Sequence, residues 1–339
     1  MELVRENINF ERGKDPKSSL GIGRRFFIDK WFRTWAPDVE YKIDNNLNIT
    51  VKRFLVLSNT SVKELPDNLT VEGDLDLNNT IIKKLPKGLT VKGSLYLQRT
   101  LIKELPEDIL VENSIYLKGS KIERLPKNLK FNGDLDLNNT PIKELPDNLT
   151  VEGDLDLNNT IIEKPPKKLT VKKNLYLNET PIKELPDDIS IGKSLYLAGS
   201  KIEKLPKNLK VINGYLDLKR TPIKELPDNL IIEEYLNLNY TPIKKLPKGL
   251  IVKWSLSLEY SSIIELPGDI FVDKSIYLSG SKIRKLPNNL TVNGNLNLSE
   301  TPIEKLPENL TVKGDLYIKG TNIEEIPKSI KVYGRIIKY

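Results

Sequence analysis

Pairs of aspartates are the residues of this sequence whose types and spacing could support chemistry. They stand two positions apart, as Asp74 with Asp76, Asp134 with Asp136, and Asp154 with Asp156. Two carboxylates at that spacing lie on one face of a strand, where they could hold a cation or act in acid–base catalysis. The pairs lack the turn glycines and clustered carbonyls of a calcium loop, and a repeated motif spreads identical groups instead of building one asymmetric site. We therefore expect no metal site, no cofactor and no enzymatic activity.

The composition removes other kinds of active site. The 339 residues include no Cys and no His, which excludes disulfides, thiolate nucleophiles and the commonest general base. A hydrophobic content of 38% with 29% charged residues is enough for a folded core. No apolar run reaches the length of a membrane span or has the form of a signal peptide, so we expect a cytoplasmic protein.

A twenty-residue repeat positions the aspartates. In "GDLDLNNTPIKELPDNLTVEGDLDLNNT" the segment 133–140 returns unchanged as 153–160. The pattern L-x-V-x-G-x-L-x-L-x-x-T-x-I-x-x-L-P-x-x fills residues 47–339 with fourteen units and a terminal half unit, and one extra residue in "VINGYLDL" shifts the register. A fixed period held over this length is typical of a solenoid.

The chemistry of each repeat position predicts its place in a turn of the solenoid. In "DLDL" the alternation predicts a strand with Leu75 and Leu77 in the core, and stacked turns pair such strands in parallel. Position twelve is Thr or Ser in every unit, and we expect these hydroxyls to bond to backbone amides of neighbouring turns. Proline at position eighteen predicts an extended or polyproline-like return segment instead of a helix.

The segment "LDLNNTPI" resembles the leucine-rich repeat family, with Thr140 in the place usually held by Asn. The period and the "LP" element are most similar to the short repeats of bacterial secreted effectors. The resemblance implies a β-rich solenoid: a leucine-rich-repeat horseshoe with a long parallel concave sheet and an extended convex side. A β-solenoid of another type is the structural alternative. Some such effectors carry a ubiquitin-ligase domain with a catalytic Cys, which this chain lacks.

Positions six and eight of each unit should face outward from the sheet, and in leucine-rich repeat proteins that face usually binds the partner. They hold no Lys or Arg in any complete unit, although the chain has a net charge of +7. We expect a partner-binding surface of acidic and aromatic residues: Asp74, Asp76, Tyr96, Tyr116, Asp134, Asp136, Asp154, Asp156, Tyr176, Tyr196, Tyr215 and Asp217. Such a face suits a protein with a basic or amide-rich surface and argues against nucleic acid. Alternatively, Tyr and Asp are merely tolerated on a solvated strand.

The two ends do not follow the repeat. In residues 1–46, "RRFFIDKWFRTWAP" predicts an amphipathic helix with Phe27, Ile28, Trp31, Phe32 and Trp35 on its apolar face. This helix could cap the first turn, or it could dock a partner or a membrane surface; we favour the cap and expect no membrane association. The half unit at the C-terminus has no comparable cap and could form a homodimer contact.

The segment "INFERGKDPKSSLGIG" at 8–23 is similar to the opening of uncharacterised phage-encoded proteins. That resemblance implies a protein acting in the cytoplasm of an infected host. Together these features predict a non-enzymatic protein-interaction scaffold, which in a phage setting would sequester or inhibit a host protein, for example a defence protein. The alternative is a structural component of a virion or surface assembly.

Overall fold

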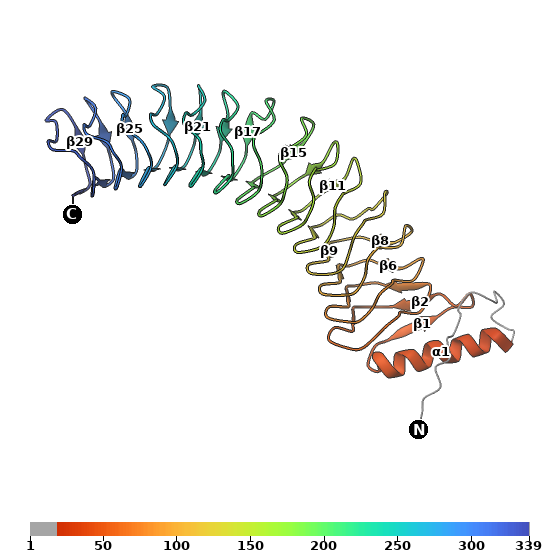
Figure 1. The fold of residues 1–339 in the computed structure, drawn as a ribbon. Coiled ribbons are helices and arrows are strands. Elements are labelled where there is room, and N and C mark those ends of the chain that lie inside the picture. The colour runs from red at the N-terminus through yellow and green to blue at the C-terminus, as the bar shows by residue number, and fades with distance from the viewer. Residues whose placement is uncertain (1–18, 339) are drawn as a thin grey trace. The chain divides into compact units, whose positions relative to one another are not determined.

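Every repeat except the one that begins at Leu129 forms one turn with two short strands, and one helix precedes the turns in the computed structural model (Figure 1). The structure describes residues 19–338, and the segment that resembles phage proteins lies largely outside them. The turns group into two compact units, Met1–Pro141 and Ile142–Tyr339. The first strand of a repeat has the sequence L-x-V and the second L-x-L. Within each unit the L-x-L strands lie on the inner side of the curve, opposite the loops that contain the Leu-Pro dipeptide.

Unit 1 contains the helix and ten strands. The elements are α1 Ser19–Trp35, β1 Tyr41–Ile43, β2 Ile49–Val51, β3 Leu55–Val56, β4 Leu69–Val71, β5 Leu75–Asp76, β6 Thr90–Val91, β7 Leu95–Tyr96, β8 Leu110–Val111, β9 Ile115–Tyr116 and β10 Leu135–Asp136. The L-x-V strands β2, β4, β6 and β8 form one parallel sheet, and β1 adds to it as an antiparallel edge. The L-x-L strands β3, β5, β7, β9 and β10 pair in that order.

Unit 2 repeats the same two strands ten times. The L-x-V strands are β11 Thr150–Val151, β13 Thr170–Val171, β15 Ser190–Ile191, β17 Val211–Ile212, β19 Ile231–Ile232, β21 Ile251–Val252, β23 Phe271–Val272, β25 Thr291–Val292, β27 Thr311–Val312 and β29 Lys331–Val332. The L-x-L strands are β12 Leu155–Asp156, β14 Leu175–Tyr176, β16 Leu195–Tyr196, β18 Leu216–Asp217, β20 Leu236–Asn237, β22 Leu256–Ser257, β24 Ile276–Tyr277, β26 Leu296–Asn297, β28 Leu316–Tyr317 and β30 Ile336–Ile337. All ten L-x-L strands form one parallel sheet, whereas the L-x-V strands form three separate sheets.

The register follows the repeat, because equivalent residues of successive turns are partners. Leu236 pairs with Leu256, and Asn237 with Ser257. The leucines of the L-x-L strands and the isoleucine of position fourteen are buried, as Leu75, Leu77 and Ile82 show, except that Ile323 of the last complete unit is partly exposed. The parallel solenoid and the strand predicted from "DLDL" are confirmed. The L-x-V strands were not predicted, although Leu69, Thr70 and Val71 show the same alternation.

The prediction that the position-twelve hydroxyls bond to backbone amides of neighbouring turns is wrong. In eleven turns the position-twelve hydroxyl donates to the carbonyl of the leucine or isoleucine three residues earlier in its own turn, at 2.6–2.8 Å. The contact between neighbouring turns comes instead from asparagines at position ten. Asn78, Asn158, Asn178 and Asn239 each accept a backbone N–H of the next turn at 2.7–2.8 Å. At position twelve the hydroxyl lies beside a carbonyl of its own tight turn, whereas the side-chain amide at position ten reaches the next turn.

Replacing Thr140 by Val should therefore lower the free energy of unfolding by about 1–2 kcal/mol. The substitution keeps the side-chain shape but removes the buried hydroxyl that donates to Leu137 O at 2.7 Å. Urea denaturation followed by circular dichroism measures the difference. Thr150→Val, at an exposed strand position, is the matched control and should be nearly neutral. Equal stability of both variants and the parent would contradict this role for the hydroxyl.

Helix α1 packs against the first turn through the apolar face predicted for it. Ile28 and Phe32 are buried at 6% and 1% exposure, while Phe26 on the other side is 63% exposed. The Phe32 ring stacks on Tyr41 of β1, with centroids 3.9 Å apart, and Trp31 Nε1 donates to Glu64 O. The helix thus lies against the first turn, and strand β1 adds to this contact by pairing with β2.

The Tyr41 hydroxyl, which joins β1 to helix α1, should make stability depend on pH in the alkaline range. It donates to Asp29 Oδ1 at 2.7 Å, and its pKa rises to about 12 because of burial, then this hydrogen bond and the Asp29 charge. The folded pKa lies above the unfolded value near 10, so the stabilisation is complete below about pH 10 and is lost as the pH rises towards 12.

We therefore expect the stability difference between the parent and Tyr41→Phe to stay constant up to about pH 10 and to shrink above it. Urea unfolding of both proteins at a series of pH values measures it. A difference that stays unchanged up to about pH 11 would show that the Tyr41 hydroxyl does not titrate as its contacts require.

Candidate functional site

The predicted surface residues lie on the outward side of the L-x-L strands, which we call the sheet face. Unit 1 carries Asp74, Asp76, Tyr96, Tyr116, Asp134 and Asp136 on this face. Unit 2 carries Asp154, Asp156, Tyr176, Tyr196, Tyr215 and Asp217. The twelve residues therefore form two groups, one in each unit.

Many acidic residues of the sheet face are hydrogen-bonded to the backbone. At position six, Asp74 Oδ1 accepts the N–H of Ser94 at 2.7 Å, and Asp154 Oδ1 accepts that of Asn174 at 2.9 Å. The same bond runs from turn to turn with other acceptors, which are Ser114, Asn174, Ser194, Ser255, Ser275, Asn295 and Asp315. We call this series the position-six ladder. It gives these polar side chains a structural role that the sequence did not reveal.

The position-eight aspartates fix the turn that follows each strand. Asp76, Asp136, Asp156 and Asp217 each accept the backbone N–H of the residue two positions later, at 2.8–3.0 Å. This local bond is the usual way in which Asp stabilises a turn. The acidic residues therefore shape the face as well as charge it, so their number alone does not indicate binding.

The tyrosines of unit 2 form a continuous row on four successive turns. The rings of Tyr176 and Tyr196 stack with centroids 4.7 Å apart and an interplanar angle of 3°. Tyr215 follows at 6.4 Å from Tyr196, and Tyr235 at 6.1 Å from Tyr215. Tyr235 was not among the predicted site residues, although its spacing of twenty from Tyr215 was a visible signal. We call these four residues the tyrosine row.

Two members of the tyrosine row stand at position six and interrupt the ladder. Ser194 Oγ accepts the N–H of Tyr215, and the next ladder acceptor is Ser255. The hydroxyl of a Tyr at position six lies at the far end of its ring, so the ladder stops at Tyr215 and Tyr235. Each missing bond costs about 1 kcal/mol of stability. Tyr215 nevertheless keeps 39% of its surface exposed, so full burial of its ring does not offset the stability lost with the missing hydrogen bond.

Carboxylates around the tyrosine row make this part of the face negative. The pKa of Tyr176 is raised by burial and then by Asp154, and the pKa of Tyr235 by burial and then by Glu259. Burial also raises the pKa of the Asp217 carboxyl between them. Half-buried phenols beside carboxylates present ring surface and hydroxyl donors within a negative potential. The arrangement can hold a cationic or amide-rich surface, and it contains no evident nucleophile.

Unit 1 carries a smaller aromatic pair on its sheet face. Tyr96 and Tyr116 stack at 5.0 Å, and the Tyr116 hydroxyl donates to Asp134 Oδ2 at 3.3 Å. Phe54 and Val56 occupy positions six and eight of the first turn and are 60% and 53% exposed. These two apolar residues were not predicted as site residues, because a single Phe and Val in the first repeat do not stand out from the pattern.

Among residues 19–338, no group of three Asp or Glu side chains is arranged to hold a metal ion. The same part of the chain contains no helix that is long and apolar enough to cross a membrane.

The stacked parallel turns, the asparagine contacts between them and the buried leucines define the leucine-rich repeat fold. Three solved structures share it. A leucine-rich repeat protein of Leptospira interrogans is 22% identical over 81% of this chain and 91% of its own, with a TM-score of 0.51. YopM, a leucine-rich effector protein of Yersinia pestis, is 21% identical over 98% and 96%, with a TM-score of 0.50. A chain of the Drosophila Toll–Spätzle complex is 19% identical over 74% and 41%, with a TM-score of 0.55. No protein-family model and no curated protein matches the sequence.

Proposed function

We propose that the protein is a non-enzymatic scaffold that binds a protein partner on the sheet face of unit 2, centred on the tyrosine row. One observation carries this proposal. Tyr215 and Tyr235 replace ladder acceptors on two successive turns, which gives up backbone hydrogen bonds for partly exposed rings. Departures from a locally stabilising pattern are expected where function requires them. Tyrosine is well suited to that function because it offers a large amphipathic contact area and loses little conformational entropy.

The charge around the row defines the chemistry of the partner. Asp154 and Glu259 contribute to the raised pKa values of the tyrosines, and positions six and eight of the complete units hold no cationic side chain. A partner with lysine, arginine or amide side chains over this area would complement the potential and associate faster at low ionic strength. Nucleic acid would be repelled by the same carboxylates.

The wider setting is also proposed. YopM is described as a leucine-rich effector protein, and the Toll chain is found in a complex with the protein Spätzle, so at least the second of these chains uses the fold beside a bound protein. The resemblance of residues 8–23 to phage proteins supports action in the cytoplasm of an infected host, where the protein would sequester a host protein. We assign residues 1–46 as the cap and 47–339 as the repeat array.

The proposal is tested by affinity capture from host lysate with two baits. The first bait is the parent protein, and the second carries Tyr196→Ser and Tyr215→Ser. A partner retained by the first bait and lost from the second supports the proposal. Proteins captured equally by both baits, or recovery of the protein as a component of purified particles, would contradict it.

A further inference from the structure

The extra residue of the array lies where one sheet of L-x-V strands in unit 2 ends and the next begins. The first three L-x-V strands of unit 2, β11, β13 and β15, form one sheet. The next sheet starts at β17, one turn further on. The L-x-L strands pass this point without a break, since Leu195 pairs with Leu216. The insertion is therefore absorbed in the segment before β17. There Val211 is 41% exposed and Ile212 takes the buried place of the repeat.

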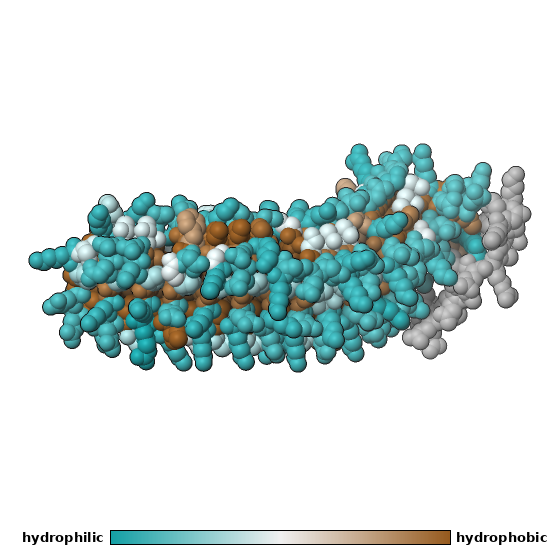
Figure 2. Space-filling view, turned by 90° about the horizontal axis from the view of Figure 1, so that it is seen from above, coloured by the Kyte–Doolittle hydropathy of each residue, from teal (hydrophilic) through white to brown (hydrophobic). Residues whose placement is uncertain are grey.

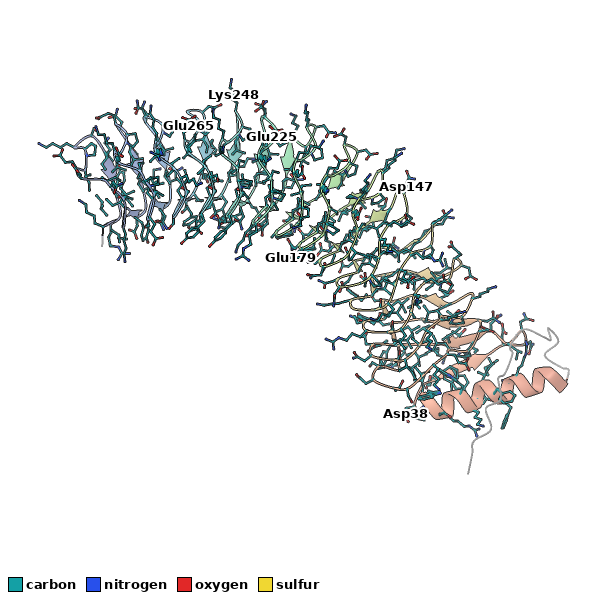
Figure 3. The ribbon with its side chains drawn as sticks, viewed as in Figure 1. Asp38, Asp147, Glu179, Glu225, Lys248 and Glu265 are labelled. Carbon is teal, nitrogen blue, oxygen red and sulfur yellow. The ribbon has the colours of Figure 1, made fainter. Side chains whose placement is uncertain are left out.

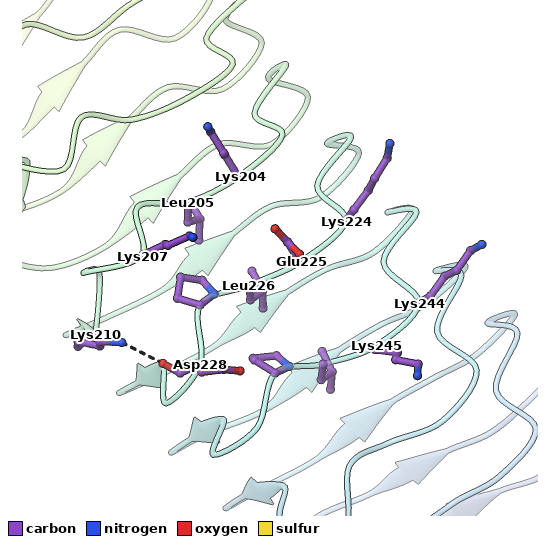
Figure 4. Close-up of a pocket in the computed structure, with 13 residues that line it drawn as sticks. Lys204, Leu205, Lys207, Lys210, Lys224, Glu225, Leu226, Asp228, Lys244 and Lys245 are labelled. Atoms are coloured by element: carbon purple, nitrogen blue, oxygen red, sulfur yellow. Dashed lines mark hydrogen bonds between the residues drawn. The ribbon is translucent and has the colours of Figure 1, made fainter.

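A groove of about 820 Å³ lies beside this break. Its wall and floor come from three successive turns (Figure 4): Lys204, Leu205, Lys207, Lys210, Lys224, Glu225, Leu226, Pro227, Asp228, Lys244, Lys245, Leu246 and Pro247. Six of these residues are lysines and two are acidic. Figure 4 shows Lys224 and Lys244 projecting from successive turns in nearly the same direction, while Lys204 points to the other side. The groove is thus cationic.

The intramolecular contacts of these lysines are weak. Lys204 lies 3.4 Å from Glu184, and Lys245 lies 4.0 Å from Glu265, both with strongly exposed side chains. Exposed pairs of this kind contribute about 0–1 kcal/mol, so a ligand can compete for the lysines at little cost. Lys210 Nζ donates to Asp228 O at 3.2 Å, which places it at the groove wall. Lys207, Lys224 and Lys244 make no ion pair with any described residue.

We propose that this groove binds an acidic polypeptide segment that also carries apolar side chains. The lysines would pair with its carboxylates, and the partly exposed Pro227, with the edges of the largely buried leucines beside it, would contact its apolar residues. Figure 2, which looks onto the loop side, shows an apolar strip between hydrophilic side chains. A nucleic acid fits less well, because the lining contains no aromatic side chain for base stacking and no arginine for bidentate phosphate contacts.

This site is separate from the tyrosine row. Glu225 and Lys248 lie on the loop side, away from Glu179, which follows strand β14 of the sheet face (Figure 3). The two surfaces also differ in sign, since the sheet face is acidic and the groove is basic. A single chain of unit 2 can therefore bind a cationic partner on one side and an acidic segment on the other. A variant that loses binding on the sheet face should therefore keep binding in the groove, and the reverse should also hold.

The experiment measures fluorescence anisotropy of a labelled peptide that alternates leucine and glutamate. The test variant carries Lys207→Glu, Lys224→Glu and Lys244→Glu, and the matched control carries Lys305→Glu, Lys313→Glu and Lys328→Glu, which changes the net charge equally. We expect the test variant to weaken binding at least about tenfold, equivalent to about 1.4 kcal/mol, and the control to change it less than about twofold.

Three outcomes would overturn the proposal. Equal loss in both variants would show that only net charge attracts the peptide. Unchanged binding of a peptide with serine in place of leucine would show that the apolar floor is not used. Tighter binding of a single-stranded DNA oligonucleotide, lost in the same test variant, would assign the groove to nucleic acid.

Discussion

The Phe32→Ala variant should lose about 3–5 kcal/mol of stability in the first turns of the array. Phe32 is 1% exposed and joins three elements, because its ring stacks on Tyr41 of β1 while helix α1 covers the turn that contains β2. Removing a buried phenylalanine costs that amount through lost burial and the cavity left behind. The stability of a repeat array is local, so the loss should be concentrated near the cap. Hydrogen–deuterium exchange measures this local loss of stability. Relative to the parent, we expect the exchange rate to rise more in β2 and β4 than in β25 and β27.

Phe26→Ala is the matched control for this prediction. Phe26 lies on the same helix but is 63% exposed, so its truncation should leave exchange in β2 unchanged. Deleting residues 1–46 should go further and promote aggregation, because it uncovers the core of the first turn. If Phe32→Ala and Phe26→Ala behaved alike, or the truncated chain stayed monomeric with an unchanged melting temperature, the helix would be a docking element instead of a cap.

The repeat predicted the fold because each position has one chemical role that returns every twenty residues. Leu75 and Leu77 show the period-two pattern of a strand, and the fixed spacing sets the register without any further information. The apolar face of α1 could be predicted for the same reason, since Ile28 and Phe32 are four residues apart. In both cases the signal is contained in a short stretch of sequence.

The structural role of the site residues could not be predicted in this way. Asp74 is an outward acidic residue in the sequence, and only the stacking of turns brings its carboxylate to the N–H of Ser94 twenty residues later. The direction of the Thr140 hydroxyl depends on the shape of its own turn, which the composition of that turn does not reveal. The basic groove could not be predicted for the same reason, because its lysines come from three different repeats. Such contacts are set by three-dimensional packing.

Once a partner is known, Tyr196→Ala combined with Tyr215→Ala should weaken its binding at least about thirtyfold. The two rings are adjacent, with centroids 6.4 Å apart, and they occupy the centre of the tyrosine row. Truncating a central aromatic anchor typically costs about 2 kcal/mol or more, and each 1.4 kcal/mol is a factor of ten in the dissociation constant. The loss should appear in the dissociation rate, because the short-range contacts are removed while the surrounding carboxylates still attract the partner. Surface plasmon resonance separates the two rates.

The controls for this experiment distinguish ring contact from general damage. Tyr196→Phe with Tyr215→Phe keeps the stacked rings and should retain most of the affinity, losing only what the hydroxyls contribute. Lys143→Ala with Glu144→Ala changes two exposed residues of the loop side and should alter binding less than about twofold. Raising the salt concentration should slow association of the parent, since the negative face attracts a cationic partner over a distance. Abolished binding in the loop-side pair, with intact binding in the Tyr→Ala pair, would place the partner on the loop side and refute the sheet-face proposal.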